Sequence, residues 1–227
     1  MSRFVTVIAA ALLLSACKGE APAPAATESA VAADEMPVMG PERRVLAVGD
    51  SLFAGYGLAP GESYPDKLEV ALRGQGINAR VTNAGVSGDT SAAGAQRFAF
   101  VLDAQPAKPD LVLVEFGGND LLRGLPPAET RKNLEAMLAE TQKRGLKVVL
   151  VGMLAPPNLG AQYKAQFEPI YPALAKKYGA TLVPFFLDGV IDKPDLMQAD
   201  HLHPTAQGVE EIVKRTSATV TGALPPK

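Results

Sequence analysis

The sequence predicts an α/β fold in three layers, α/β/α, with a parallel sheet at the centre. Short apolar runs of strand length alternate along the chain with longer segments whose apolar residues recur at helical spacing. Several of these apolar runs are closed by glycine or by a polar residue, which is typical of strands buried on both faces. Strands that alternate with helices form right-handed βαβ units, so helices should cover both faces of the sheet.

The expected elements follow this alternation from residue 44 to the end of the chain. Strands are expected at residues 44–49, 79–84, 110–116, 147–153 and 181–183. Helices are expected at about residues 64–73, 90–102, 127–144 and 162–178, with a last helix from about residue 205. Pro169 and Pro172 should kink or split the fourth of these helices. We expect one domain with a five-stranded, flavodoxin-like sheet in the order 2-1-3-4-5.

Composition and charge narrow the class of protein. The chain has 227 residues, of which 47% are hydrophobic and 20% charged, as expected for a globular domain with a sizeable core. The formal net charge is -2 and no basic run occurs, so the sequence lacks the electrostatic footprint of a nucleic-acid-binding protein.

The amino end predicts export and a lipid anchor. Residues 1–16 contain Arg3, an apolar core and a small-residue end, and they are too short to span a bilayer, which is typical of a secretory signal. Cys17, the only cysteine, ends a Leu-Ser-Ala-Cys sequence that resembles a bacterial lipobox, although a plain signal peptide with a chance cysteine is the alternative. Residues 17–41 are rich in Ala and Pro and predict a disordered tether, followed by the domain at residues 42–227. We therefore expect a periplasmic, membrane-anchored lipoprotein that is a monomer.

Ser51 follows the first predicted strand, in the tetrapeptide Gly-Asp-Ser-Leu of residues 49–52. In open α/β sheets ligands bind at the carboxyl ends of the strands, where the connecting loops part and leave a crevice. Two further polar loops, residues 83–85 and 117–120, follow neighbouring strands and should reach the same edge. Because a serine hydroxyl is a poor nucleophile, it needs a base within hydrogen-bond reach and a third group that orients the base.

The chain holds only two histidines, His201 and His203, both just before the last helix. In a turn, residues three apart can lie on one side, so Asp200 can hold His203 more readily than His201. This spacing predicts His203 as the base and Asp200 as its partner. A metal cluster is the alternative, but these residues lack the helical spacing of two metal-binding histidines and have no cysteine nearby.

Negative charge that develops on a carbonyl oxygen needs fixed hydrogen-bond donors. Gly85 suits one such donor because, without a β-carbon, its backbone N–H can approach a ligand closely. Asn119 could supply its side-chain amide and Ser51 its own backbone N–H. We expect these three residues to form an oxyanion hole.

These residues fall in the order of the four sequence blocks of a known superfamily. Residues 49–52, Gly85 in NAGVSGDT, Asn119 in GGND, and Asp200 with His203 in DHLHP resemble the SGNH, or GDSL, hydrolases. The resemblance covers about residues 44–207 and is greatest to the bacterial thioesterase I, lysophospholipase and arylesterase subgroup.

The resemblance implies Ser51 as nucleophile, His203 as general base and acid with Asp200 as its partner, and Ser51, Gly85 and Asn119 as the oxyanion hole. It implies no cofactor and no metal. His201 departs from the pattern, because relatives commonly have glycine there, and a second imidazole could perturb pH behaviour, touch the substrate or do nothing.

Apolar residues near these loops suggest where an acyl group binds. Leu121, Leu122 and Leu125 follow Asn119, and residues 185–187 are also apolar, although core packing explains them equally well. We expect a serine esterase that hydrolyses carboxylic esters or thioesters, including aryl esters and lysophospholipids, through an acyl-enzyme. The alternatives are a carbohydrate or peptidoglycan O-acetylesterase and, in a different class, a catalytically silent binding domain on a membrane tether.

Overall fold

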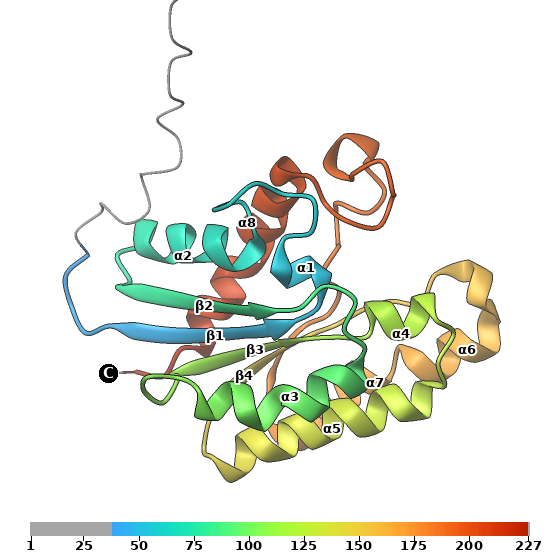
Figure 1. The fold of residues 1–227 in the computed structure, drawn as a ribbon, viewed down its shortest axis with the longest axis horizontal. Helices are drawn as coiled ribbons and strands as arrows, with labels where there is room; N and C mark the ends of the chain where they lie inside the picture. The colour runs from blue at the N-terminus through green and yellow to red at the C-terminus, as the bar shows by residue number, and fades with distance from the viewer. Residues whose placement is uncertain (1–37, 227) are drawn as a thin grey trace, which may run out of the picture.

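The structure, a computed structural model, describes residues 38–226 and has three layers (Figure 1). Its sheet consists of five parallel strands in the order β2-β1-β3-β4-β5. The strands are β1 (Arg43–Gly49), β2 (Ala79–Gly85), β3 (Leu111–Glu115), β4 (Lys147–Val151) and β5 (Thr181–Val183). The predicted fold class and strand order are confirmed.

Helices cover both faces of the sheet, as Figure 1 shows. On one face lie α2 (Tyr64–Gly74) and α8 (Ala206–Ala223), which pack against each other, and on the other face lie α3 (Ser91–Asp103), α5 (Pro127–Lys143) and α7 (Ile170–Tyr178). The short helices α1 (Ser51–Ala54), α4 (Gly118–Leu122) and α6 (Gly160–Phe167) lie at the end towards which the strands run, and two 3₁₀ turns span Pro157–Leu159 and Pro194–Leu196.

Side-chain caps fix where three of the helices begin. The hydroxyl oxygens of Ser63, Thr90 and Thr205 accept backbone N–H groups three residues further on, at 3.4, 3.3 and 3.2 Å. Each cap satisfies one of the backbone donors that the first helical turn leaves without a partner. The predicted helix at residues 162–178 is split into α6 and α7 around Pro169, as proline in a helix interior requires.

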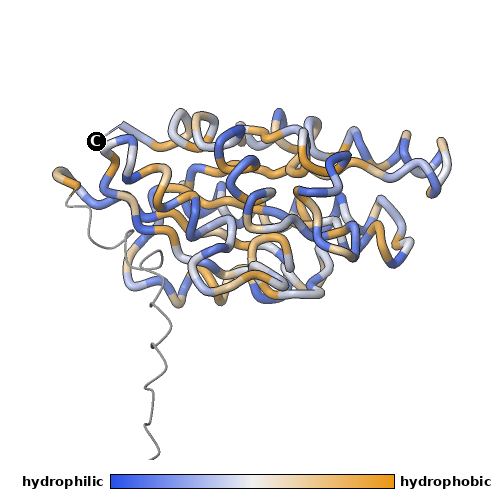
Figure 2. The backbone as a smooth tube through the Cα atoms, turned by 90° about the horizontal axis from the view of Figure 1, so that it is seen from above, coloured by the Kyte–Doolittle hydropathy of each residue, from blue (hydrophilic) through white to orange (hydrophobic). Residues whose placement is uncertain are grey.

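The core forms between the sheet and its helices. All five residues of β3 are buried, because helices cover both faces of this central strand. In Figure 2 apolar and polar stretches alternate along the tube, in keeping with elements that turn one face inward. Two phenylalanines of α3 show these two faces, since Phe98 is 1% exposed and Phe100 is 75% exposed.

Both ends of the described chain lie at the end of the sheet where β1 begins. The Arg43 guanidinium donates a hydrogen bond to the Pro225 carbonyl at 2.8 Å, and the carboxyl terminus lies there in Figure 1. The loops that follow the strands are therefore at the opposite end of the domain. The predicted signal peptide and almost all of the tether lie outside the described residues, and between residues 38 and 226 no helix has the length and hydropathy needed to cross a membrane.

We predict that two substitutions on α3 have very different effects on stability. Phe98→Ala should lower the free energy of unfolding by about 3–5 kcal/mol, because it empties a buried ring site. Phe100→Ala should change it by about 0.5 kcal/mol or less, because that ring is mostly in solvent. Urea unfolding of both variants measures the difference, and equal losses would contradict this placement of the helix.

Candidate active site

The register of the sheet brings two polar loops together. β1 pairs with β3 in parallel, with Val48 opposite Val114, so the two strands end side by side. Ser51 starts α1 directly after β1, and Asn119 lies in α4 directly after β3. The expectation that these loops share one edge of the sheet is confirmed.

The local structure around Ser51 leaves its backbone donor open. Asp50 caps α1, and its Oδ1 atom accepts the N–H of Leu52 at 3.0 Å. Within residues 38–226 the N–H of Ser51 donates no hydrogen bond to another protein group. A ligand beside the Ser51 hydroxyl could therefore use this N–H as well.

His203 lies between Ser51 and Asp200. Its Nε2 atom is 2.9 Å from the Ser51 Oγ, and its Nδ1 atom is 2.7 Å from the Asp200 Oδ2. The other oxygen of Asp200, Oδ1, accepts the N–H groups of Leu202 and His203 at 2.9 and 3.0 Å. This arrangement matches the three-residue spacing from which Asp200 was expected to hold His203.

The surroundings of Asp200 keep its carboxyl ionised. Partial desolvation raises its pKa, but the hydrogen bonds from His203 and from the backbone N–H groups of Leu202 and His203 outweigh this effect and lower the pKa to about 2. Asp200 therefore carries a negative charge over the whole range in which an imidazole titrates.

His201 lies beside these groups without joining them. Its backbone φ of 56° makes it the one non-glycine residue with positive φ among residues 38–226. The turn that Asp200 closes imposes this conformation, in which a residue with a β-carbon is strained. The His201 side chain is exposed and lines the crevice described below.

The structure gives Gly85 a role other than the expected one. β2 is an edge strand, and the N–H of Gly85 donates to the Asn83 side-chain oxygen at 2.9 Å rather than facing the Ser51 hydroxyl. A β-carbon at this position would lie 2.4 Å from the backbone nitrogen of Ala54. Glycine is needed here because β2 and α1 pack closely, and not because of a free N–H.

A glycine three residues later has the property expected of Gly85. Gly88 has a φ of 86°, and its N–H donates no hydrogen bond within the described part of the chain. Its carbonyl accepts a hydrogen bond at 2.8 Å from Arg123, the residue that ends α4. Gly88 was not predicted from the sequence. The block NAGVSGDT contains both Gly85 and Gly88, and residue type alone does not show which of the two has a free N–H.

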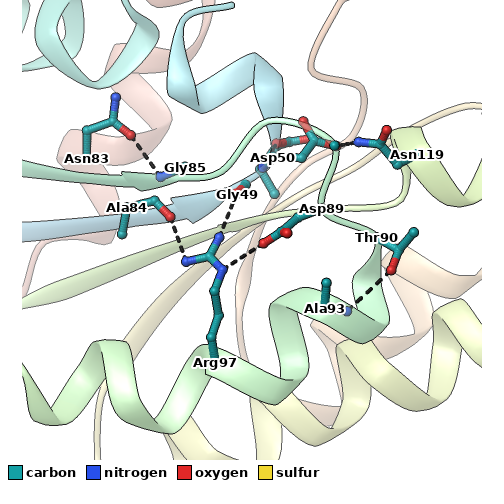
Figure 3. A network of polar contacts seen from close by, with 12 residues as sticks. Gly49, Asp50, Asn83, Ala84, Gly85, Asp89, Thr90, Ala93, Arg97 and Asn119 are labelled. Atoms are coloured by element: carbon teal, nitrogen blue, oxygen red, sulfur yellow. Dashed lines mark hydrogen bonds and ion pairs between the residues drawn. The ribbon is translucent and has the colours of Figure 1, made fainter.

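Arg97 on α3 joins the ends of β1 and β2 (Figure 3). Its guanidinium donates to the carbonyls of Gly49 and Ala84 at 2.9 and 2.8 Å, and its Nε atom donates to Asp89 at 2.7 Å. Both carbonyls belong to residues just before the loops of the site. One side chain therefore fixes the spacing of these loops, a role that the sequence did not indicate.

An apolar crevice of about 460 Å³ opens beside Ser51. Ser51, Asn119 and His203 lie in its wall, and so do Leu121 and Leu122 as predicted. Leu125 does not line it, which corrects the expectation for that residue, because α4 ends before it and its backbone turns back to the Asp120 carbonyl. Phe185 and Leu187 also line the crevice, whereas Phe186 is in the core.

One wall of the crevice was not predicted from the sequence. Residues 153–159 follow β4 and line it with a run of mainly apolar side chains, and Ile191 and Leu202 complete the rim. This loop follows a strand at the same edge as Ser51, and that position was the signal that could have found it.

Three features define the class of α/β/α hydrolases. They are the three-layer fold, the serine that is hydrogen-bonded to a histidine at a strand end, and the crevice beside it. Residues 47–210 match the GDSL-like Lipase/Acylhydrolase family. The chain belongs to this family, and the family assignment made from the sequence is confirmed.

Similar proteins include enzymes that act on ester bonds. The chain is 43% identical to "Arylesterase" from Vibrio mimicus over 161 residues, 71% of this chain and 80% of the relative. It is 38% identical over 160 residues, 70% of this chain and 74% of the relative, to "Thioesterase 1/protease 1/lysophospholipase L1" from Escherichia coli K12. The crystal structure of AlinE4, a SGNH-hydrolase family esterase, has a TM-score of 0.70 and 65% identity, and the match covers 83% of this chain and all of that one. The chain is thus an ester hydrolase.

Proposed function

We propose that the protein is a serine esterase that cleaves carboxylic esters and thioesters through an acyl-enzyme. Ser51 is the nucleophile, His203 the general base and acid, and Asp200 the residue that orients His203. The observation that carries this proposal is the continuous chain of short contacts, 2.9 Å from Ser51 to His203 and 2.7 Å from His203 to Asp200.

The reaction follows from these contacts. The Ser51 Oγ attacks the ester carbonyl carbon while its proton moves to His203 Nε2, and the charge that forms on the imidazole is stabilised by ionised Asp200. The tetrahedral species then expels the alcohol or thiol, which takes the proton from His203, and leaves an acyl group on Ser51. Water then attacks this acyl-enzyme while His203 Nε2 accepts a proton from it. The second tetrahedral species releases the acid as His203 returns this proton to the Ser51 Oγ.

The oxyanion of each tetrahedral species needs donors that face the crevice. The open N–H of Ser51 and the side-chain amide of Asn119, both beside the Ser51 hydroxyl in the crevice wall, supply two of them. For the third donor we propose the N–H of Gly88 in place of Gly85, because the N–H of Gly85 is already bonded to Asn83.

The crevice indicates the substrate class. Its wall is mainly apolar and extends from Ser51 over Leu122 and the loop of residues 153–159, which suits an acyl chain or an aryl group. The names of the relatives, an arylesterase and a thioesterase and lysophospholipase, support the same range of substrates. A site for acetylated sugars would need more polar groups to bind the sugar hydroxyls.

The amino end supports a proposal for location. We infer that residues 1–16 direct export, that Cys17 is acylated, and that the tether up to residue 41 holds the enzyme at the periplasmic side of a membrane. The Leu-Ser-Ala-Cys sequence carries this inference, and it lies outside the described residues.

The two histidines should separate in activity. Ser51→Ala and His203→Ala should each lower kcat by about 10⁴-fold or more, because they remove the nucleophile or its base. His201→Ala should retain activity within about tenfold, as expected of a residue that only borders the crevice. Steady-state kinetics with an aryl ester tests the ranking, with urea unfolding to show that each variant is folded, and an active His203→Ala enzyme would exclude the proposed base.

The pH dependence of kcat/KM tests the same catalytic assignment. His203 must be neutral to accept the Ser51 proton, so kcat/KM should rise with pH as an imidazole deprotonates. Because the pKa of Asp200 is about 2, its protonation should add no second step to the acid limb above about pH 3. Two ionisations in that limb would contradict the ionised Asp200.

Acyl chain length should affect kcat/KM through Leu122. Each methylene buried in the crevice contributes about 0.8 kcal/mol, or about fourfold in kcat/KM. In a series of aryl esters, kcat/KM should therefore rise as the acyl group is lengthened from acetyl. Leu122→Ser should flatten this rise, whereas Leu125→Ser, outside the crevice, should not and serves as the matched control. If acetyl esters are the best substrates and Leu122→Ser has no effect, the enzyme is better described as an acetylesterase.

Cys17→Ser should release the protein from membranes. An acyl chain contributes about 0.8 kcal/mol per buried methylene, and removing the acylated cysteine removes this attachment. Fractionation of cells that produce either form, followed by an esterase assay of soluble and membrane fractions, measures the shift. An unchanged membrane fraction would favour a plain signal peptide and a different mode of attachment.

A further inference from the structure

Two carboxyl groups are buried in contact beneath the candidate active site. Glu115 ends β3 and is 0% exposed, and Asp50 follows β1 and is 1% exposed. The N–H of Asp50 donates to Glu115 Oε2 at 3.2 Å, and the two side chains are hydrogen-bonded to each other. Gly49 makes room for this contact, since a β-carbon there would lie 2.8 Å from Glu115 Oε2. In the described residues no lysine or arginine forms an ion pair with either carboxyl.

The surroundings of the two groups decide which one is ionised. Two carboxylates in contact cannot both be charged in a buried site, so the pair holds one proton. Asp50 accepts hydrogen bonds from the Leu52 N–H and the Asn119 amide, each at 3.0 Å, whereas Glu115 Oε1 has no partner. Burial raises the pKa of both carboxyls. For Asp50 the hydrogen bonds from Leu52 and Asn119 oppose this rise, whereas the pKa of Glu115 is raised well above its ordinary value, first by burial and further by the charge on Asp50. Glu115 is therefore the protonated member and donates to ionised Asp50.

Ionised Asp50 controls the orientation of Asn119. The carboxylate only accepts hydrogen bonds, so Asn119 must turn its NH₂ group, and not its oxygen, towards Asp50 Oδ2. Its Nδ2 atom donates to this oxygen at 3.0 Å, and Figure 3 shows the nitrogen facing Asp50. One amide hydrogen is used in this contact, and the other is left for the crevice, where Asn119 lies in the wall. If the amide were reversed, an oxygen would occupy this position and repel an oxyanion.

We propose that Glu115 is a positioning residue for ester hydrolysis, a buried neutral acid that holds Asp50 as a single negative charge and thereby fixes the amide of Asn119 towards the oxyanion. This proposal rests on the proposed function, in which Asn119 is an oxyanion donor. Glu115 contacts no substrate, because it is fully buried and absent from the crevice wall. It acts only through Asp50.

The test compares two substitutions of Glu115. Glu115→Gln keeps a neutral donor of the same shape, so kcat should stay within about threefold of the native enzyme. Glu115→Leu removes the donor, so kcat should fall about 10–100-fold with KM unchanged, the scale for losing a residue that orients a functional group. A purely structural role predicts instead that Glu115→Leu lowers the free energy of unfolding, because buried Asp50 loses a hydrogen-bond partner, while the folded enzyme keeps its native kcat. Urea unfolding of both variants is measured alongside the kinetics.

Two further variants make the result decisive. Asn119→Ala should lower kcat about 10²–10³-fold, and adding Glu115→Leu to it should lower kcat little more, because both changes disable the same donor. Asp50→Asn should lower kcat nearly as much as Asn119→Ala does. If Glu115→Leu does not fold, Asp50→Asn takes its place in the test. If Asn119→Ala is slow but Glu115→Leu has native kcat, or if Glu115→Gln is as slow as Glu115→Leu, the positioning role is wrong. If Asn119→Ala itself has native kcat, the oxyanion assignment in the proposed function fails first.

Discussion

The parallel pairing of β1 with β3 is the constraint on which the rest of the site depends. It brings the two strands to the same edge, so that Asp50 meets Glu115 and the loop that carries Asn119 lies beside Ser51. Helices on both faces bury these strands, and the side chains of Asp50 and Glu115 at the strand ends are 1% and 0% exposed. With Asp50 as the ionised member of the pair, its charge interacts more strongly with its buried neighbours than it would in water. The geometry of a few polar side chains thus follows from backbone register in an apolar core.

The strand ends also need groups that satisfy their last carbonyls. Arg97 does this for Gly49 and Ala84, and Tyr171 on α7 does it for Phe116 with a hydrogen bond of 2.9 Å. Both donors come from helices on the same face of the sheet. The helices on the face opposite α8 therefore hold the loops of the site in place. His203 comes from the other face, in the segment that leads into α8. The site forms only where the two layers meet across the sheet edge.

The fold was largely predictable because buried strands and amphipathic helices leave a periodic signal in the sequence. The approach of Asp200 and His203 to Ser51 was predictable as well, since the topology brings both segments to one edge. Other features depend on directions that residue type does not encode. The N–H of Gly85 points along the open edge of β2, which only the strand order and register reveal, and Leu125 leaves the crevice because α4 ends at Leu122. Arg97 and Glu115 act through contacts with segments distant in sequence, at 48 and 65 residues.

The separation of Ser51 and His203 along the chain has a consequence for activity during synthesis. Ser51 and His203 are 152 residues apart, and His203 lies just before α8. With His203 as the base, a polypeptide emerging from the ribosome carries its nucleophile long before it carries the means to activate it. On this assignment the growing chain cannot hydrolyse an ester until the segment that carries His203 has been made and has folded against the end of β1.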